Sequence, residues 1–484
     1  VRERIRAWMA QQPQDRAELS ENTIRLAYAE RLQAVFKALL HQDMSTALAA
    51  GSRALVYCVQ AGAWDRLGGF ASCLVTSTDD PRLLAELVPH LQTAAESAPA
   101  GKPRWSCLCY LADALRLGGR PDTSLPFFEQ AAAQAGAVAE AGGNDAQQAW
   151  ADLVWINGNW ANALGAVGKL DAARQRLLES TDATKTAGRP AIYVIASELE
   201  TLRIDIMQGE VAAALPEVET RLAQVEAWWQ QQRAGQRVPE APDVESLARA
   251  LISALDIARQ AHFAQEDWPA ALCRIDAALA VQRVLQRPAE DVAATRMNRA
   301  VVLCRMHRFG EAWAELEACL ALFQNDSAMS ARVLGSLANL FAQQGDFAQA
   351  ITQERRALAL REQLPGPADR AISHNNLANS LELRGSASAL VESARHRLAA
   401  LVYWLVADLG QDLQTSLHNY ALHMRRARAA GSVATISRVA DLLADPAFAS
   451  LAQWLSQRQV DRDELQAAVD QLLEQVRQAA FANP

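Results

Sequence analysis

Aromatic side chains are scarce in this sequence: Phe, Trp and Tyr make up only 6% of 484 residues, although 50% of the residues are hydrophobic. Ala and Leu supply most of the hydrophobic residues, and both favour helices. The sequence almost lacks β-branched runs, regular apolar and polar alternation, and Asn-Gly turns, which would indicate strands. The composition therefore argues against a sheet and predicts an all-α fold.

Excess positive charge and long apolar runs are also missing. The formal net charge is −8, whereas a non-specific nucleic-acid binder needs a basic face, so we expect no nucleic-acid partner. No stretch approaches the roughly 18 apolar residues of a membrane span, and no signal peptide is apparent. The seven cysteines are odd in number and scattered, which predicts buried thiols in a reducing compartment rather than disulfides. We expect a cytoplasmic protein without membrane contact.

Motifs that carry chemistry are absent as well. The sequence contains no GxSxG, HExxH or paired CxxC motif. Cys304 and His307 lack a second pair of metal ligands. The run from Gly165 to Lys169 superficially resembles a phosphate loop, but Leu170 stands where Ser or Thr is required. These absences predict a protein that is not an enzyme and has no metal and no cofactor.

A recurring pattern of small residues is the strongest positive signal. A small residue is followed nine positions later by an apolar one and twelve positions later by another small one, as in Ala161/Leu170/Ala173, Ala300/Phe309/Ala312 and Ala338/Phe347/Ala350, and more loosely in Ala112/Pro121/Ser124. Small residues at this spacing allow two antiparallel helices to approach closely across a tight turn, which predicts a helical hairpin. The frame recurs about every 40 residues, at Ala300, Ala338, Ala378 and Ala421, which indicates a repeat array.

Breaks in the helical periodicity divide the chain into five predicted parts. The first is an N-terminal helix over 1–18, which we expect to be the end of an upstream domain, and the second consists of degenerate hairpins over 19–98. Repeats over 99–245 follow and end in an exposed Pro-rich loop from Gln230 to Pro242. The most regular repeats cover 246–430, and capping helices cover 431–484. The last predicted helix, Asp461 to Phe481, is apolar on one face and polar on the other, as the end of a repeat array requires.

One repeat carries a family resemblance. Residues 373–385, Ser-His-Asn-Asn-Leu-Ala-Asn-Ser-Leu-Glu-Leu-Arg-Gly, resemble the first helix of a tetratricopeptide repeat of the long type found in kinesin light chains and many bacterial multidomain proteins. The preceding residues 357–364 resemble its second helix, and the resemblance extends over about 22–428. It implies an α-solenoid, a right-handed superhelix of roughly nine to twelve hairpins whose first helices line a concave face. Val35 and Arg259 depart from the pattern, because each stands where a small residue is expected.

Asparagines recur at two fixed offsets from the small residue of the first helix. Two positions before it stand Asn159, Asn298, Ser336, Asn376 and Asn419, and one position after it stand Asn162, Asn339 and Asn379. Asn is unfavourable inside helices, so its recurrence requires a cause. The resemblance implies that such asparagines face the concave groove and bond the backbone of an extended peptide, since an amide both donates and accepts. The alternative is an Asn ladder that joins neighbouring helices.

The predicted ligand-binding set adds Trp155, Asn375 and Arg425 to these asparagines. A second predicted set, Trp228 and Trp229, is a surface contact. Trp155 is an anchor in the groove or a core residue, and Arg425, beside Arg426, clamps a carboxylate or is merely solvated. Trp228 and Trp229 form a contact surface or pack on the next hairpin. The full groove set is Trp155, Asn159, Asn162, Asn298, Asn339, Asn375, Asn376, Asn379, Asn419 and Arg425.

The sequence thus predicts a non-catalytic module that binds a protein or peptide. Residues 1–9, Val-Arg-Glu-Arg-Ile-Arg-Ala-Trp-Met, resemble the segment that closes the winged-helix region of bacterial signalling ATPases of the STAND class. That resemblance implies a ligand sensor that releases an upstream ATPase, which then oligomerises. The alternative is a constitutive scaffold that assembles partner proteins, and an α-solenoid enzyme is disfavoured because no catalytic constellation is present.

Overall fold

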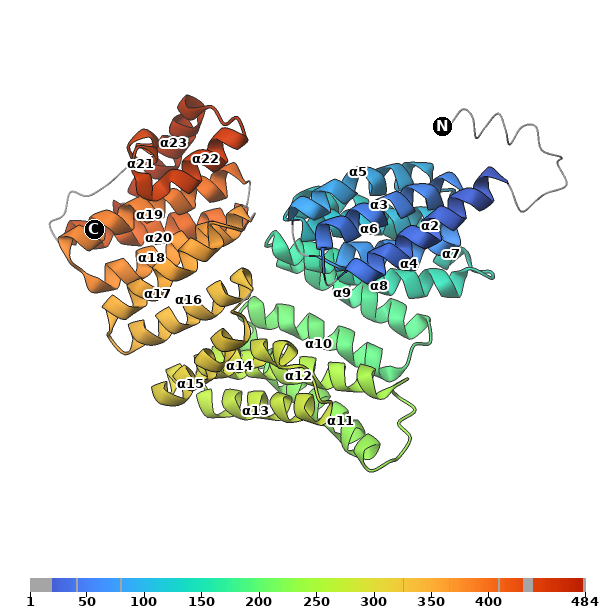
Figure 1. Cartoon of the computed structure of the whole chain (residues 1–484). Coiled ribbons are helices and arrows are strands. Elements are labelled where there is room, and N and C mark those ends of the chain that lie inside the picture. Colours follow the sequence, from blue (N-terminus) through green and yellow to red (C-terminus); the bar gives the residue numbers. More distant parts are fainter. Residues whose placement is uncertain are drawn as a thin grey trace. The chain divides into compact units, whose positions relative to one another are not determined.

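The computed structural model describes residues 20–40, 42–78, 81–324, 326–364, 366–407, 410–429 and 438–481 (Figure 1). All regular elements in these ranges are helices, and none is a strand. The all-α prediction is confirmed. The predicted helix over 1–18 lies outside the described residues.

The chain divides into two compact units. Unit 1 comprises 1–208 and 239–242, and its helices are α2 (Glu21–Leu39), α3 (Met44–Gln60), α4 (Trp64–Thr76), α5 (Pro81–Ser97), α6 (Lys102–Leu117), α7 (Pro121–Ala141), α8 (Ala146–Ala166), α9 (Leu170–Thr186) and α10 (Ala191–Met207).

Unit 2 comprises 209–238 and 243–484. Its helices are α11 (Val211–Arg233), α12 (Val244–Ala264), α13 (Trp268–Val284), α14 (Ala289–Arg305), α15 (Phe309–Leu322), α16 (Ser327–Gln343), α17 (Phe347–Arg361), α18 (Pro367–Arg384), α19 (Ala387–Val406), α20 (Gly410–Ala429), α21 (Val439–Leu443), the 3-10 helix η2 (Pro446–Phe448), α22 (Ala449–Gln457) and α23 (Arg462–Phe481). The prediction of five parts along the chain stays a prediction.

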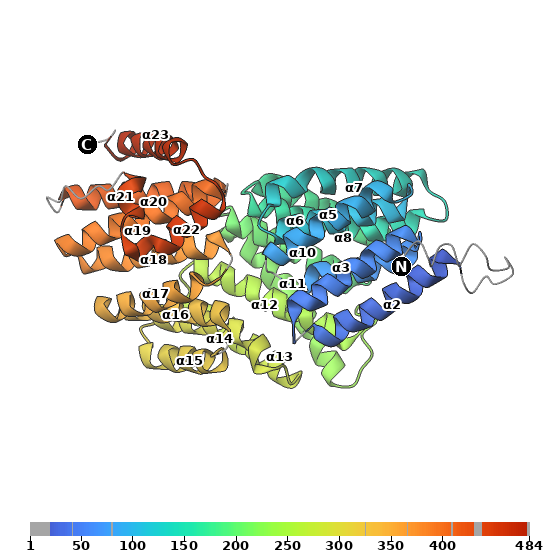
Figure 2. The ribbon, with the colours of Figure 1, turned by 45° about the horizontal axis from the view of Figure 1, so that its top comes forward.

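Within each unit, consecutive helices pack as antiparallel pairs, as Figure 2 shows for α6 to α8 and for α16 to α19. All eight small residues of the recurring pattern are buried, and each apolar residue of the pattern is the first residue of a second helix. The turns contain glycine with positive φ, +74° at Gly168 and +82° at Gly345, a conformation that is costly for other residues. The predicted hairpins are confirmed, and the chain is an all-α solenoid.

First helices also contact one another in unit 2. In addition to its own partner, α14 contacts α16, and α16 contacts α18. These three helices therefore form one layer of the solenoid, and α15 and α17 belong to the other layer. A side chain that points away from the second helices on α14, α16 or α18 lies on a shared surface.

Two sequence expectations fail in detail. The loop predicted from Gln230 begins only after Arg233, because Gln and Arg are good helix formers and α11 continues through them. The loop is also not exposed throughout, since Val238 is buried and the Glu240 carbonyl accepts a hydrogen bond from the Ile192 N–H at 3.0 Å.

The degenerate first repeat has a simple explanation. Val35, which occupies the small-residue position, is 42% exposed, and the neighbouring Phe36 packs in the core instead. Five of the seven cysteines are buried as expected, whereas Cys73 and Cys273 are exposed because they lie on the outer faces of their helices.

The last described helix, α23, has the amphipathic character that the sequence predicts. Leu465, Val469 and Leu473 of α23 are buried, and its opposite face is exposed. The Asp461 side chain caps the helix by accepting from the Glu464 N–H at 3.0 Å. Among the described residues, no helix has both the length and the apolar character that a membrane crossing requires.

Candidate functional site

The predicted groove asparagines of unit 2 lie on neighbouring helices of one layer. Asn298 on α14 and Asn376 on α18 are half-buried, while Asn339 on α16 and Asn379 on α18 are exposed. Because α14 contacts α16 and α16 contacts α18, these asparagines lie on three adjacent helices, and their role as one ligand-binding surface stays a prediction.

A cavity of about 390 Å³ opens beside this surface, between α12 and α14 and over α13. Asn298 lines it, together with apolar side chains that include Ile252, Leu255 and Ile275. The amide of Asn298 thus lies beside apolar side chains, which suits a peptide segment that inserts one side chain and bonds through its backbone.

Three arginines and one aspartate line this cavity, and each arginine lies near a carboxylate of the chain. Arg259 donates through Nε to Asp256 at 2.7 Å, and Arg274 donates through Nη2 to Glu219 at 2.6 Å. The Nε of Arg274 is buried and has no acceptor among the described residues. Arg249 is largely exposed, and its guanidinium lies 3.8 Å from Glu245. The guanidinium groups retain free N–H donors for an acidic group of a ligand.

Asn375 and Asn379 have a different environment. Both accept hydrogen bonds from the buried Arg397 of α19, at 2.6 Å in the case of Asn379. Arg397 also donates to the buried carboxylate of Glu382 through Nε at 3.0 Å and Nη2 at 2.9 Å. These two asparagines therefore help to join α18 to α19, as the ladder alternative describes.

The same carboxylate joins a third helix. Glu382 accepts from Arg426 of α20 at 2.7 Å and lies 3.0 Å from Nδ1 of His423. Burial raises the pKa of Glu382, but hydrogen bonds from His423 and Arg397 outweigh it and lower the pKa to about 2. Glu382 is thus ionised at neutral pH and links three successive helices of unit 2.

In unit 1, Asn159 makes a bond of the same kind. Its Nδ2 donates to Asp113 of α6 at 2.8 Å, across the boundary between two repeats. Asp113 is buried, and burial raises its pKa despite the opposing charge of Arg116. Trp155, one turn earlier on α8, packs against Tyr110 with ring centroids 5.3 Å apart.

Trp155 also lines a cavity of about 490 Å³ between α4, α6 and α8 of unit 1, with Trp64, Gly68 and Tyr110 among its neighbours. The indole is half-buried, so it serves the packing of two repeats and still borders an open space. The environment of Trp155 thus has features of a core residue, which packs on a neighbouring repeat, and of a groove residue, which borders open space.

The remaining predicted residues are dispersed. Asn162 is exposed on α8, Asn419 is half-buried on α20, and Arg425 is exposed and already engaged with other groups of the chain. The Oδ1 of Asn339 accepts from Gln343 within its own helix at 3.0 Å. These four residues do not share a cavity with Asn298.

Trp228 and Trp229 of α11 are both buried, with 8% and 4% of their surfaces exposed. A partner that docked on this part of unit 2 would therefore reach little of either ring. Their burial against the helix array fits the packing alternative for these residues.

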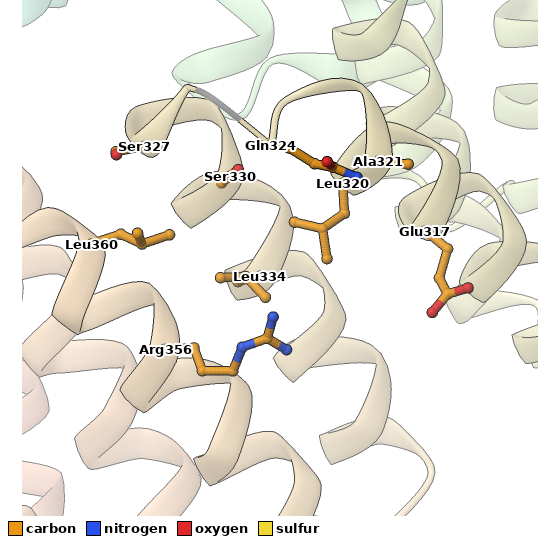
Figure 3. A pocket seen from close by; sticks show the side chains of 9 residues that line it. All are labelled: Glu317, Leu320, Ala321, Gln324, Ser327, Ser330, Leu334, Arg356 and Leu360. Carbon is orange, nitrogen blue, oxygen red and sulfur yellow. The ribbon is translucent and has the colours of Figure 1, made fainter.

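A third cavity, of about 490 Å³, lies between α15, α16 and α17 (Figure 3). Figure 3 shows Arg356 extending from α17 toward Leu334 of α16, with Glu317 of α15 at the opposite edge. Its charged lining is balanced, with one carboxylate and one guanidinium. Within the described residues, no group of three His, Cys, Asp or Glu side chains is placed to hold a metal ion.

Sequence reasoning missed the arginines of the α12–α14 cavity, although one signal was present. Arg259 stands where the pattern demands a small residue, and in the structure the adjacent Ala258 is fully buried in its place. The departure from the repeat pattern thus coincided with a cavity-lining residue. Glu382, Arg397 and His423 carried no comparable signal.

Comparison with known proteins gives one family match. Residues 291–363, which correspond to α14 to α17, match the family model of the tetratricopeptide repeat. No curated protein sequence matches the chain.

Several solved structures resemble the chain at low identity. A STAND protein with a tetratricopeptide repeat sensor from Pyrococcus horikoshii is 11% identical with a TM-score of 0.44, and the match covers 83% of this chain and 56% of that protein. A tetratricopeptide repeat protein from Parabacteroides merdae is 12% identical with a TM-score of 0.41, over 66% of this chain and 99% of that one. A Rap protein complexed with competence and sporulation factor is 11% identical with a TM-score of 0.38, over 85% and 99% of the two chains.

This chain spans little more than half the length of the Pyrococcus protein. All three TM-scores are below 0.5, so these likenesses support no conclusion about function. The family match is local and agrees with the two helix pairs seen over the same residues. Residues 291–363 are tetratricopeptide repeats, and the chain is a helical solenoid that carries this protein-interaction module.

Proposed function

We propose that this chain binds an extended segment of a partner protein on the layer formed by its first helices, with the cavity between α12 and α14 as the anchor point. The observation that carries this proposal is the cavity itself, which combines Asn298, apolar side chains and three arginines in about 390 Å³. Solenoids of stacked repeats use such surfaces for binding.

The chemistry of the cavity defines the segment that it accepts. The amide of Asn298 donates and accepts at once, which suits a peptide backbone. Ile252, Leu255 and Ile275 receive an apolar side chain, and the arginines at the rim pair with a carboxylate. The preferred ligand is therefore a segment with an apolar residue next to an acidic group.

A selection experiment tests this proposal. Random peptides are displayed and selected on the full chain, and the affinity of a selected synthetic peptide is measured by fluorescence anisotropy. The Asn298→Ala variant is expected to bind about tenfold more weakly, the loss typical of one good hydrogen bond in a desolvated site. The matched control, Asn144→Ala, changes an exposed asparagine of unit 1 outside the predicted groove set and is expected to bind like the wild type.

Equal affinities of the two variants would contradict the assignment of the cavity. Melting curves recorded by circular dichroism show whether either variant is unfolded. Preference of the selection for basic rather than acidic peptides would contradict the proposed role of the arginines.

The wider role of the module has two candidate forms. The sensor of a bacterial STAND-type ATPase rests on the resemblance of residues 1–9, which lie outside the described residues, and the constitutive scaffold requires no upstream partner. Nucleotide-dependent assembly of the whole protein distinguishes them, since only the sensor requires it. The absence of catalysis and of a nucleic-acid partner stays a prediction.

A further inference from the structure

A further groove lies on the side of α8 that is opposite to Trp155 and Asn159. It has a volume of about 660 Å³ and is lined by residues of α7, α8 and α9 in unit 1. Trp150, Asn157 and Trp160 follow the helical period and lie on the face of α8 away from Trp155. We call this space the α7–α9 groove, and it goes beyond the function proposed above, which concerns the layer of first helices.

The groove is wide because one wall is built from small residues. Ala132, Ala133, Gly136 and Ala137 of α7 line it, while Trp150 and Trp160 of α8 form much of its aromatic surface. Small side chains leave room above the indole rings, so a partner side chain has space to lie flat against them.

Charge in the groove is strongly one-sided, with four carboxylates and a single guanidinium. Arg176 is already occupied, since it pairs with Glu179 at 2.6 Å and stacks over the Trp160 ring at 4.3 Å. The carboxylates of Glu129, Glu140 and Asp182 make no hydrogen bond or ion pair with any described residue. Three negative charges thus remain uncompensated around one groove.

Two buried polar atoms of the lining residues also lack partners. Asn157 is only 4% exposed, and its Oδ1 accepts no hydrogen bond from a described residue. The Nε1 of Trp160 is buried and has no acceptor in the part of the chain that the structure describes. Buried polar groups are nearly always satisfied, so these two atoms independently point to a ligand.

We propose that the α7–α9 groove binds a basic segment of a partner protein and takes an arginine side chain from it. The guanidinium stacks on an indole, as Arg176 does on Trp160 within the chain itself. It donates to Asn157 and pairs with the free carboxylates, and a backbone carbonyl of the segment accepts from Trp160. Arginine fits better than lysine because its planar fork both stacks and donates in several directions.

The cavity between α15, α16 and α17 serves as an internal comparison. It also lies over a first helix between two second helices, but its charged lining is one Glu317 and one Arg356. A basic segment therefore gains no net attraction there. The charge excess distinguishes the α7–α9 groove from a gap that is common to the repeat architecture.

The test uses the full chain and a blocked peptide that contains two arginines in a Gly/Ser background, titrated by calorimetry. Its counterparts carry citrulline, which is neutral, or lysine. The site variant is Glu140→Gln with Asp182→Asn, and the control variant is Glu86→Gln with Asp145→Asn, which makes the same charge change at exposed positions outside the groove. A third variant, Asn157→Leu, removes the unsatisfied acceptor.

We expect the arginine peptide to bind the wild type and the control variant equally, within a factor of two. Binding to the site variant and to Asn157→Leu, and binding of the citrulline peptide, should be at least tenfold weaker. The melting temperature of Asn157→Leu should stay the same or rise, whereas a purely structural role of Asn157 would lower it.

Three outcomes would overturn the proposal. The first is equal affinity of the arginine peptide for the site and control variants, which would indicate general attraction to an acidic protein. The second is the absence of binding up to about 1 mM peptide. The third is self-association of the wild type that the site variant abolishes, since the occupant would then be a second copy of the chain.

Discussion

Replacement of Glu382 by glutamine tests whether the buried ion cluster of unit 2 holds successive repeats together. The Glu382 side chain is fully buried. Its Oε1 accepts hydrogen bonds from Arg397 and, at 3.0 Å, from Ser393, and it lies 3.0 Å from Nδ1 of His423. Its Oε2 accepts from Arg426 at 2.7 Å. These contacts join α18, α19 and α20 through one carboxylate.

The magnitude follows from the pKa of Glu382. Burial opposes the charge, yet the hydrogen bond of His423 and the charge and hydrogen bonds of Arg397 lower the pKa from 4.5 to about 2. Each pKa unit corresponds to about 1.4 kcal/mol, so the ionised carboxylate contributes about 3 kcal/mol to folding. This contribution is present above pH 4.5 and is lost as the pH falls from 4.5 toward 2, because the unfolded state binds the proton first.

We expect Glu382→Gln to lower the free energy of opening of α18 to α20 by about 3 kcal/mol at pH 7, since it leaves Arg397 buried without its counter-charge. Native-state hydrogen exchange measures this opening helix by helix. Urea denaturation at pH 7 and pH 3 should show a smaller pH dependence for the variant than for the wild type.

Glu392→Gln is the matched control. Interactions with His396, 3.9 Å away, and with Arg355 also lower the pKa of Glu392 to about 2, but its side chain is 36% exposed and solvent screens its interactions. Its loss should therefore cost less than about 1 kcal/mol. Equal losses for the two variants, or no loss for Glu382→Gln, would refute the reasoning.

Further predictions concern a buried acid, two glycines and two asparagines. Burial raises the pKa of Glu354 to about 8, so its contribution to stability is present below pH 4.5 and is lost as the pH rises through 8; Glu354→Gln should raise the free energy of unfolding at pH 9 by about 2–4 kcal/mol in urea denaturation. Gly51→Ala should lower the melting temperature, because the new Cβ would lie 2.2 Å from a leucine methyl group. Gly69→Ala, whose new Cβ would have no atom within 4 Å, should raise the melting temperature slightly. Equal melting temperatures of the two variants, or a higher one for Gly51→Ala, would contradict the packing. Asn379→Ala removes a bond to a buried arginine and should cost about 1–2 kcal/mol, while Asn376→Ala should leave stability unchanged; similar losses for both would show that the two amides have the same role.

Local signals made the fold predictable from the sequence. Gly168 and Gly345 mark turns that require positive φ. The small alanines of the recurring pattern, which lie before and after each turn, allow the two helices to pack closely. The register of each hairpin therefore follows from residues within one repeat. The extent of α11 was missed because the loop composition beyond Gln230 resembles a turn although its first residues favour a helix.

The polar contacts between repeats were less predictable. Glu382 and His423 are 41 residues apart, and Asn159 and Asp113 are 46 apart, so their pairing depends on how neighbouring hairpins stack. The sequence identified Asn159 as a special residue but could not distinguish a ligand contact from a contact between helices. Cavities pose the same difficulty, since the space beside Asn298 depends on the separation of α12 and α14.

Site-directed photo-crosslinking tests the central claim most directly. A benzoylphenylalanine is introduced in place of Asn298, which lines the α12–α14 cavity, or in place of Val284, an exposed residue of α13 outside it. With a peptide selected on the full chain, we expect a crosslink from position 298 and none from position 284. A crosslink from position 284 without one from position 298 would contradict binding on the layer of first helices.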